Sequence, residues 1–330
     1  MTDPSGLIPI VVVSGFLGSG KTTLLRNLLR DPAVGEAAVI VNEFGEVGID
    51  HHLARKTDTR TTLLRNGCIC CSLRDDLAEA LRDLISERDR GQISRLDRII
   101  IETTGLADPA PILQTVVADP MLRNHFRVSR VVATLDALGG LTNIEQYGEA
   151  LRQIAAADHV LVTKQDLATA AAVGALKARV AAINPTATIV DATFGRIDFA
   201  LLTGNEPMSS VTDLRLQPAP ATVHATAGRV ESRCFVFTES LNWQMFGIWL
   251  TMLLHQYGDR ILRMKGLLNI GDGHGPLLLE GVQHVIHAPR HLREWPDEDR
   301  HSRIVFIARD LDLNQVAESL TTFQALAAIV

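Results

Sequence analysis

The first half of the chain alternates short apolar runs with segments of helical periodicity. The apolar runs are rich in β-branched residues and predict strands, whereas the segments between them repeat apolar residues on one helical face. The predicted strands are Ile8–Ser14, Ala37–Asn42, Asp97–Glu102, Arg127–Leu135 and His159–Thr163, and the predicted helices are Thr22–Arg30, Leu73–Arg90, Asn143–Ala156 and Leu167–Ile183. This alternation is typical of a doubly wound α/β domain with a mainly parallel sheet.

The helix predicted at Leu73–Arg90 has a continuous apolar face. This face is formed by Leu73, Leu77, Leu81, Leu84 and Ile85. Ser72 and Asp75 have the spacing of an N-terminal cap and its partner, so the helix is expected to begin at this point. Its first turn therefore follows directly after a cluster of cysteines.

A change in composition divides the chain. From Gly204 to Gly228 the sequence is rich in Pro, Ser, Thr and Ala, which is typical of an exposed connection. We therefore expect an α/β domain at residues 1–205, a linker at 206–228 and a smaller α+β domain at 229–330. In the smaller domain, strands are predicted at Arg229–Thr238, Ile261–Ile270, Leu277–Ile286 and Arg303–Ala308, and helices at Leu241–Tyr257 and at the end of the chain.

Composition narrows the functional classes. Hydrophobic residues make up 46% of the 330 positions and charged residues 21%, so a sizeable core can form. The net charge of -6 is spread without long blocks of one sign, which disfavours a nucleic-acid partner. The first residues lack the basic region of a signal peptide and no apolar run reaches membrane-spanning length, so a cytoplasmic protein is expected. With only four cysteines, a disulfide framework is not expected.

The segment Gly15–Thr22 reads GFLGSGKT and matches the phosphate-binding pattern G-x-x-x-x-G-K-[ST], between a predicted strand and a predicted helix. In such a loop the backbone N–H groups surround the phosphates, Lys21 reaches the β- and γ-phosphates, and the Thr22 hydroxyl ligates Mg²⁺. The expected nucleotide-binding residues are Gly15, Gly18, Ser19, Gly20, Lys21, Thr22 and Thr23. An ordinary Gly-rich turn is the alternative, but it does not explain the flanking strand and helix.

Glu102 follows the apolar run Ile99–Ile101 and stands at the carboxyl end of a predicted strand. Ligands of α/β sheets bind at this edge, so Glu102 is expected to reach Mg²⁺ through water or to orient the attacking water. A helix cap or a solvated carboxylate is the alternative interpretation. Lys21 and Glu102 are therefore the predicted catalytic residues.

The motif Thr163–Asp166 reads TKQD and follows another apolar run. The Asp166 carboxylate can accept hydrogen bonds from both N1–H and the 2-amino group of guanine, and adenine offers no matching pair of donors. Thr163, Lys164 and Asp166 are therefore expected to bind the nucleotide base. The start of a surface helix would give the same short pattern, but its place after the phosphate loop and Glu102 favours guanine recognition.

Three of the four cysteines, Cys68, Cys70 and Cys71, fall within four positions. Clustered thiolates bind soft metals, and Zn²⁺, Cu(I) and Co²⁺ all suit such a site. The start of the following helix also favours thiolate over thiol. A thiol redox switch is the alternative, because closely spaced thiols oxidise readily. Cys234 stands apart and is expected to be a buried, small apolar residue.

The segment Asn42–His52 runs between the phosphate loop and the cysteines and contains two glycines, three carboxylates and two histidines. It could be a switch segment in which Glu46, His51 or His52 supplies a further metal ligand. A solvated acidic loop fits each of these residues equally well. The histidines of the smaller domain, His274, His284, His287, His291 and His301, are scattered and are expected at the surface or at strand ends.

Together and in this order, these motifs resemble the CobW-type GTPases, a branch of the P-loop GTPases that includes metal chaperones and insertases. The resemblance covers nearly the whole chain and rests on Gly15–Thr23, Asn42–Glu46, Gly67–Cys71, Glu102–Gly105, Thr163–Asp166, Lys265-Gly266, Gly281–His284 and Arg303–Ala308. It implies Mg²⁺-dependent hydrolysis of GTP. It also implies a transition metal, zinc or cobalt, held by Cys68, Cys70 and Cys71, and a metal-requiring client protein as partner.

Two departures limit what the resemblance implies. Thr163 stands where GTPases generally carry Asn, which implies a weaker loop anchor with the guanine preference retained. The long histidine-rich tract of some cobalt-linked relatives is absent, which removes one reason to favour cobalt. The rival functions are a P-loop kinase acting on a small molecule, for which no Arg-rich lid is seen, and a nucleotide-binding redox sensor. Neither nucleic acid nor a membrane is an expected partner, and the chain could form a homo-oligomer.

Overall fold

The computed structural model describes residues 6–41, 60–63, 72–93, 95–203, 221–225, 228–271, 273 and 275–326. The chain forms two compact units. Unit 1 contains Met1–Asn143, Ala157–Lys177 and Ile189–Glu206, and unit 2 contains Ile144–Ala156, Ala178–Thr188 and Pro207–Val330. Among the described residues, every helix is too short or too polar to cross a lipid bilayer.

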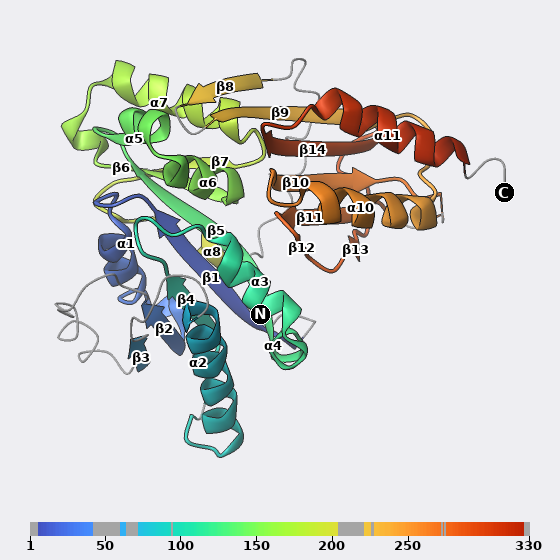
Figure 1. Cartoon of the computed structure of the whole chain (residues 1–330). Helices are drawn as coiled ribbons and strands as arrows, with labels where there is room; N and C mark the ends of the chain where they lie inside the picture. Colours follow the sequence, from blue (N-terminus) through green and yellow to red (C-terminus); the bar gives the residue numbers. More distant parts are fainter. Residues whose placement is uncertain are drawn as a thin grey trace. The chain divides into compact units, whose positions relative to one another are not determined.

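A seven-stranded sheet forms the centre of unit 1 (Figure 1). Across the sheet the strands are β3 (Arg60–Leu63), β2 (Ala37–Val41), β4 (Arg98–Glu102), β1 (Ile8–Gly15), β5 (Phe126–Asp136), β6 (His159–Thr163) and β7 (Thr188–Ala192). From β3 to β6, each pair of neighbours is parallel. The predicted doubly wound, mainly parallel sheet is confirmed.

Helices connect these strands. They are α1 (Lys21–Leu28), α2 (Ser72–Asp89), α3 (Ala110–Ala118), α4 (Pro120–His125), α5 (Gly140–Gln146), α6 (Gly148–Ala156), α7 (Ala170–Ile183) and α8 (Ala200–Thr203). The predicted apolar face of α2 is confirmed at Leu77, Leu81, Leu84 and Ile85, which are all buried. Leu24 and Leu28 of α1 share a core cluster with Val11 and Val13 of β1. Buried contacts therefore fix both elements that flank the phosphate loop.

Two helices predicted in the first half of the chain differ from the structure. The prediction of one helix at Asn143–Ala156 is wrong, because α5 ends at Gln146 and Gly148 begins α6. Glycine lowers helix propensity, which favours a break at this point. The helix predicted from Leu167 begins only at Ala170, because Gln165–Leu167 form a separate 3₁₀ turn, η4.

The sequence pattern also missed other elements in the first part of the chain, among them α3, α4 and β7. In α4, Asp119 caps the helix by accepting hydrogen bonds from the N–H groups of Met121 and Leu122. The apolar helix α3 has no polar face that would reveal a helical period. Strand β7 is short and only partly buried. Its sequence therefore lacks the apolar run that predicted the other strands.

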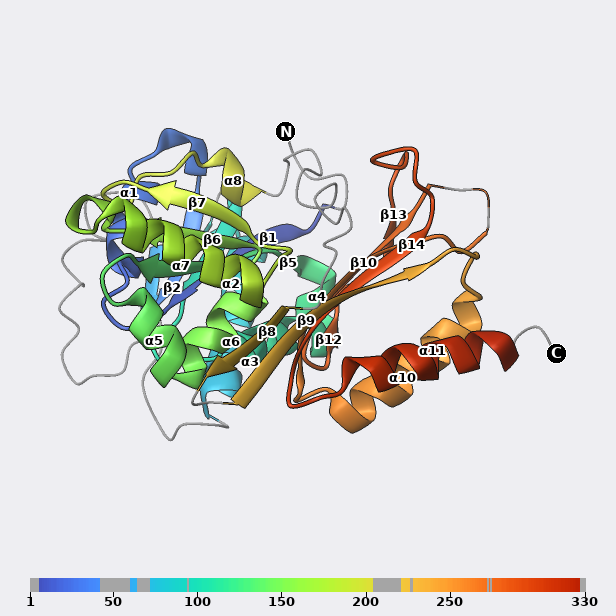
Figure 2. The same cartoon turned by 90° about the horizontal axis from the view of Figure 1, so that it is seen from above.

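Unit 2 contains an antiparallel sheet with two helices on one face (Figure 2). The strand order is β12 (Val285–Ile286), β11 (Leu277–Val282), β10 (Ile261–Leu268), β14 (Ser302–Arg309), β9 (Gly228–Phe237) and β8 (Ala221–Ala225), with β13 (Arg290–His291) paired to β11. Helices α10 (Trp243–Tyr257) and α11 (Leu313–Leu326) share a core with this sheet through Phe246, Trp249, Phe306 and Leu320. The predicted α+β class of the C-terminal part is confirmed.

Two details of unit 2 differ from the prediction. Strand β8 lies inside the stretch predicted as an irregular connection, and it pairs in antiparallel register with β9. The prediction of one strand at Leu277–Ile286 is wrong, because β11 and β12 form a tight hairpin. Gln283 in its turn has a φ of 52°, and a period-two apolar pattern cannot show such a reversal.

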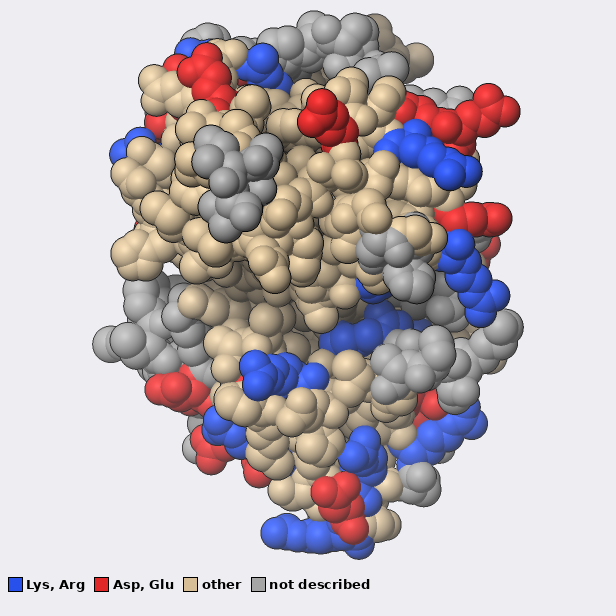
Figure 3. All heavy atoms as spheres, turned by 90° about the vertical axis from the view of Figure 1, so that its right-hand side faces the viewer, with Lys and Arg blue, Asp and Glu red and all other residues tan. Residues whose placement is uncertain are grey.

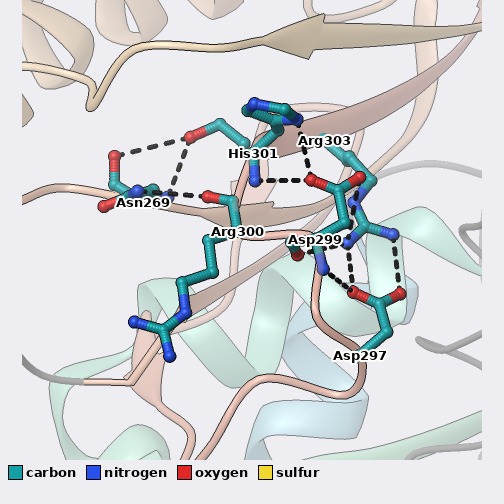
Figure 4. Close-up of polar contacts among 7 residues, drawn as sticks. Asn269, Asp297, Asp299, Arg300, His301 and Arg303 are labelled. Carbon is teal, nitrogen blue, oxygen red and sulfur yellow. Dashed lines mark hydrogen bonds and ion pairs between the residues drawn. The ribbon is translucent and has the colours of Figure 1, made fainter.

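Arg303 of β14 is a fully buried cation held by the turn that precedes the strand (Figure 4). Its guanidinium donates to the two carboxylate oxygens of Asp297 at 3.1 and 2.8 Å and to the carbonyl of Asp299 at 2.7 Å. The hydrogen bonds that Arg303 donates to Asp297 raise the pKa of Arg303 further above its usual range. His301 Nδ1 lies 2.7 Å from Asp299 Oδ1. The turn is therefore tied to the sheet by one buried charge.

Candidate nucleotide site

Three glycines with positive φ shape the phosphate loop. Gly15, Gly18 and Gly20 have φ angles of 137°, 71° and 101°, a region that other residues rarely adopt. A Cβ atom at Gly15 would lie 2.3 Å from Thr134 Oγ1 and 2.4 Å from Thr134 O. The loop therefore passes β5 at a distance that only glycine allows, and it turns directly from β1 into α1.

Lys21 lies against this loop. Its Nζ donates hydrogen bonds to the carbonyl oxygens of Gly15 at 2.8 Å and Phe16 at 3.2 Å. Burial lowers the pKa of Lys21, and the nearby charge of Glu102 opposes this shift. A phosphate would be a stronger acceptor than either carbonyl, because both partners would then be charged. The Lys21 ammonium therefore lies at the phosphate loop, where it can bind an anion.

Thr22 at the start of α1 and Glu102 at the end of β4 face each other. Thr22 Oγ1 donates to Glu102 Oε1 at 3.1 Å. Strands β1 and β4 are neighbours with Val13 opposite Glu102, so the sheet register brings the carboxylate to the phosphate loop. A hydroxyl and a carboxylate are hard oxygen donors of the kind that Mg²⁺ binds. The pair therefore fits the magnesium ion that the sequence predicts.

Thr163 connects the end of β6 to the phosphate loop. Its Oγ1 donates to the carbonyl oxygen of Ser19 at 2.7 Å. Ser19 Oγ donates to Phe16 O at 2.7 Å and lies 2.6 Å from Thr134 Oγ1. All of these groups are buried. A threonine at the position of the usual asparagine thus still anchors one loop directly to the other.

The loop after Thr163 presents its carboxylate to solvent. Asp166 is exposed in η4, and Lys164 before it has a φ of 54° with Nζ 3.7 Å from Asp136 Oδ2. Gln165 Nε2 donates to a β6 carbonyl at 2.9 Å and to Asp191 Oδ1 at 2.7 Å. Gln165 therefore ties this loop to the end of β7.

The turn after β7 lies on α1, beside the predicted nucleotide residue Thr23. Asn27 Nδ2 donates to the carbonyl oxygen of Phe194 at 2.7 Å. A Cβ atom at Gly195 would lie 3.1 Å from Thr23 Cγ2. The side chain of Phe194 is 69% exposed. Helix α1, which follows the phosphate loop, therefore supports a second loop at the same edge of the sheet.

Sequence reasoning missed several side chains at this edge. Thr134 and Asp136 stand at the end of a strand that was predicted, so the position rule that identified Glu102 would also have identified them. Asp191 and Asn27 gave no such signal. Asp191 lies in a strand that was not predicted, and Asn27 acts through a turn that is distant in the sequence.

Several predicted metal-binding positions lie outside the described residues. They are Cys68, Cys70, Cys71, Glu46, His51 and His52. Within the described ranges, no group of three or more His, Cys, Asp or Glu side chains could hold a metal ion. Cys234 is partly buried, and burial raises the pKa of its thiol although the charge of Arg303 opposes this.

A glycine loop with a lysine, placed between a parallel strand and a helix and faced by Glu102, defines a P-loop nucleotide-binding protein. Residues 9–191 match the CobW/HypB/UreG nucleotide-binding domain, and residues 230–324 match the cobalamin synthesis protein CobW C-terminal domain. The chain belongs to the CobW family.

Curated relatives and solved structures agree with this assignment. The chain is 36% identical to the zinc chaperone YjiA of Escherichia coli (strain K12) over 310 residues, which cover 94% of this chain and 96% of that protein. It is 32% identical to the zinc chaperone CobW of Pseudomonas aeruginosa, covering 96% of this chain and 91% of that protein. The crystal structure of Zn(II)-bound YjiA GTPase from E. coli has a TM-score of 0.71 and 29% identity, covering 96% and 99% of the two chains.

Proposed function

We propose that this protein is a GTP-hydrolysing metallochaperone or metal insertase whose nucleotide state controls the binding and transfer of a transition metal. The observation that carries the proposal is the convergence of Lys21, Thr22 and Glu102 at one edge of the sheet, with Thr163 anchored to the same loop. Relatives named zinc chaperones and a Zn(II)-bound GTPase of the same fold support it.

GTP hydrolysis requires positioned phosphates and neutralised charge. Lys21 would exchange its two carbonyl acceptors for β- and γ-phosphate oxygens. Thr22 and Glu102 would hold Mg²⁺, which supplies further charge neutralisation when bound. Glu102 also lies where it could orient the attacking water. The N–H groups between Gly15 and Thr22 would complete the phosphate cradle.

Guanine recognition is assigned to Asp166. Its exposed carboxylate can accept hydrogen bonds from N1–H and the 2-amino group of the base. Adenine would place an acceptor opposite the carboxylate and leave it unpaired, which costs affinity. Thr163 and Gln165 hold the loop from either side, and Lys164 lies two positions before Asp166 in sequence.

The transferred metal is assigned to Cys68, Cys70 and Cys71, with Glu46 as a further ligand. Three thiolates supply most of a tetrahedral shell. The names of the relatives favour zinc, and cobalt suits the same donors. The proposed recipient is a metal-requiring client protein in the cytoplasm. We also retain the proposed division into residues 1–205, a connection at 206–228 and residues 229–330.

Nucleotide state and metal affinity are expected to be coupled. The segment Glu43–His52 lies between the phosphate loop and the cysteines in sequence, so contacts with the γ-phosphate could reshape the metal shell. Linkage requires that GTP changes metal affinity by the same factor as metal changes GTP affinity, typically about 5- to 150-fold. Hydrolysis would then make metal release directional.

The test is a metal-competition titration of the reduced protein with GDP and with a non-hydrolysable GTP analogue. The two states should differ in metal affinity by at least about 5-fold. The difference should shrink in Glu46→Ala and persist in Cys234→Ser, which changes a thiol outside the proposed site. Equal metal affinity in both nucleotide states would contradict the mechanism, even if GTP hydrolysis and metal binding were each measured.

A further inference from the structure

Phe194 stands in the turn after β7 with a backbone conformation that phenylalanine rarely adopts. Its φ is 51° and that of Gly195 is 69°, and the N–H of Arg196 donates to the carbonyl oxygen of Thr193 at 3.0 Å. Two consecutive residues with positive φ are typical of a type I′ turn, in which Asn, Asp or Gly normally takes the first of these positions. A bulky residue there costs free energy, and such strain is concentrated at functional sites.

Exposure of the Phe194 side chain does not by itself identify a site. Much of the surface of a folded protein is apolar, and single exposed apolar residues are normal. Figure 3 shows one face on which uncharged residues cover large areas between scattered Lys, Arg, Asp and Glu. Phe194 differs from an ordinary surface residue because it is 69% exposed and its backbone is strained at the same time. The feature to be explained is therefore a strained turn that holds an aromatic ring in solvent.

Helix α1 holds this turn on the phosphate side of the nucleotide site. Asn27 Nδ2 donates to the carbonyl oxygen of Phe194 at 2.7 Å. Gly195 is buried, and a Cβ atom on it would lie 3.1 Å from Thr23 Cγ2 and 3.2 Å from the backbone nitrogen of Leu24. Thr23 directly follows the phosphate loop in sequence. The turn is therefore fixed against the first turns of the helix that begins at the phosphates.

The loop of Asp166 holds the same turn on the base side. Gln165 Nε2 donates to Asp191 Oδ1 at 2.7 Å, and Lys177 Nζ donates to Asp191 Oδ2 at 2.8 Å. Gln165 directly precedes Asp166 in sequence. Asp191 lies three residues before Phe194, which is at most about 11 Å along the chain. Phe194 therefore lies within reach of both the carboxylate expected to bind the base and the helix expected to hold the phosphates.

We propose that Phe194 stacks on one face of the base of the bound nucleotide. A base that is hydrogen-bonded through its edge to Asp166 keeps both faces of its ring open, and aromatic side chains commonly cover such faces. Stacking uses the π-face that guanine and adenine share, so Phe194 adds affinity without choosing between them. The anchored turn fixes the backbone of Phe194 before the nucleotide binds, which lowers the entropy cost of binding. The inference rests on the proposed nucleotide site, but it does not require that the base is guanine.

The test compares Phe194→Ala, which removes the ring, with Phe194→Trp, which keeps an aromatic ring. Calorimetric titration of the full chain with Mg²⁺ measures the affinities of GDP, ADP and inorganic pyrophosphate. Phe194→Ala should weaken GDP and ADP by a similar factor, about 5- to 100-fold, and leave pyrophosphate unchanged, because pyrophosphate has no base to stack. Phe194→Trp should bind both nucleotides as tightly as wild type.

Met121→Ala is the matched control. It removes a large apolar side chain that is 41% exposed in α4, the helix that leads into the amino end of β5. This variant should leave all three affinities unchanged. Phe194→Trp offers a second measurement, because the three natural tryptophans all lie in unit 2 and the new one lies in unit 1. The added fluorescence should change when GDP binds and stay constant when pyrophosphate binds.

Wild-type affinity for GDP and ADP in Phe194→Ala would overturn the inference. An equal loss of pyrophosphate affinity would overturn it as well, because the turn would then act on the phosphate loop through α1. Equal losses in Phe194→Ala and Phe194→Trp would show a structural role of the turn in place of stacking. If wild-type protein binds ADP as tightly as GDP, the guanine assignment fails, but a loss of both nucleotides in Phe194→Ala alone still supports stacking.

Discussion

At the scale of single residues, one carboxylate is expected to set the choice of base. Asp166→Asn should reduce the ratio of GDP to ADP affinity by roughly 10- to 100-fold, because the amide places a donor opposite a donor of guanine. Direct titration of both nucleotides with Mg²⁺ measures this ratio. Asp89→Asn, at the exposed end of α2, is the control and should leave it unchanged. A wild-type ratio in Asp166→Asn would remove the guanine assignment.

The burial of Arg303 leads to a second prediction at the scale of single residues. Asp297→Ala should lower the free energy of unfolding by about 3 kcal/mol, because it leaves a buried guanidinium without its main counter-charge. Asp299→Ala should cost less, since its carboxylate is 3.6 Å from Arg303 and 34% exposed. Urea unfolding followed by tryptophan fluorescence tests this, because all three tryptophans lie in unit 2. Equal losses in the two variants would contradict the role given to Asp297.

At the scale of elements, periodicity predicted what is locally encoded. Strand β1, the phosphate loop and α1 follow from an apolar run, a glycine pattern and a helical repeat that are adjacent in the chain. Strands β7 and β12 are short and partly exposed, so neither forms a long apolar run. Their stability depends on neighbouring strands rather than on their own sequence. The pattern therefore missed β7 and merged β12 with β11.

The candidate site also has a part that the sequence predicts and a part that it does not. Lys21, Thr22 and Glu102 could be predicted because each belongs to a short motif or to a strand end. The bond from Thr163 to Ser19 joins residues 144 positions apart, and it exists because β5 and β6 pair in one particular register. A single sequence does not reveal such a register. The supporting contacts of the site are therefore visible only in the folded chain.

The cap of α4 gives a prediction about pH. The N–H of Leu122 lowers the pKa of Asp119, and Arg82 contributes in the same direction. A carboxylate whose pKa is lower in the folded state stabilises the fold above its unfolded pKa of about 3.9. This stabilisation is lost as the pH falls through the lower, folded value.

Asp119→Ala should therefore lower the free energy of unfolding by about 1 kcal/mol at neutral pH. The difference from wild type should shrink as the pH falls below about 4. Urea unfolding followed by circular dichroism at several pH values measures both. Asp83→Ala removes an exposed carboxylate from the middle of α2 and serves as the control. A difference that stays constant down to acid pH would contradict the role of Asp119.

At the scale of the whole molecule, the metal site is expected to be separate from Cys234, the fourth cysteine of the chain. Reduced protein should bind about one Co²⁺ with thiolate-to-metal charge-transfer absorption, because Cys68, Cys70 and Cys71 supply most of a tetrahedral shell. The absorption should vanish in Cys70→Ser and persist in Cys234→Ser, since Cys234 lies in β9 and burial raises the pKa of its thiol. An unchanged spectrum in Cys70→Ser would exclude the site, and disulfide formation without metal uptake would favour a redox sensor.

The hydrogen bond from Thr163 to Ser19 joins the loop expected to hold the base to the phosphate loop, so the two ends of a nucleotide are expected to act as one bivalent ligand. A base that orders its own loop also steadies the phosphate loop, so guanosine and pyrophosphate offered separately should bind more weakly than their joined form predicts. The same connection works in reverse once the γ-phosphate has left. We expect that loosening of the phosphate loop would reach the loop of Asp166 through Thr163 and would weaken the hold on GDP at both of its ends.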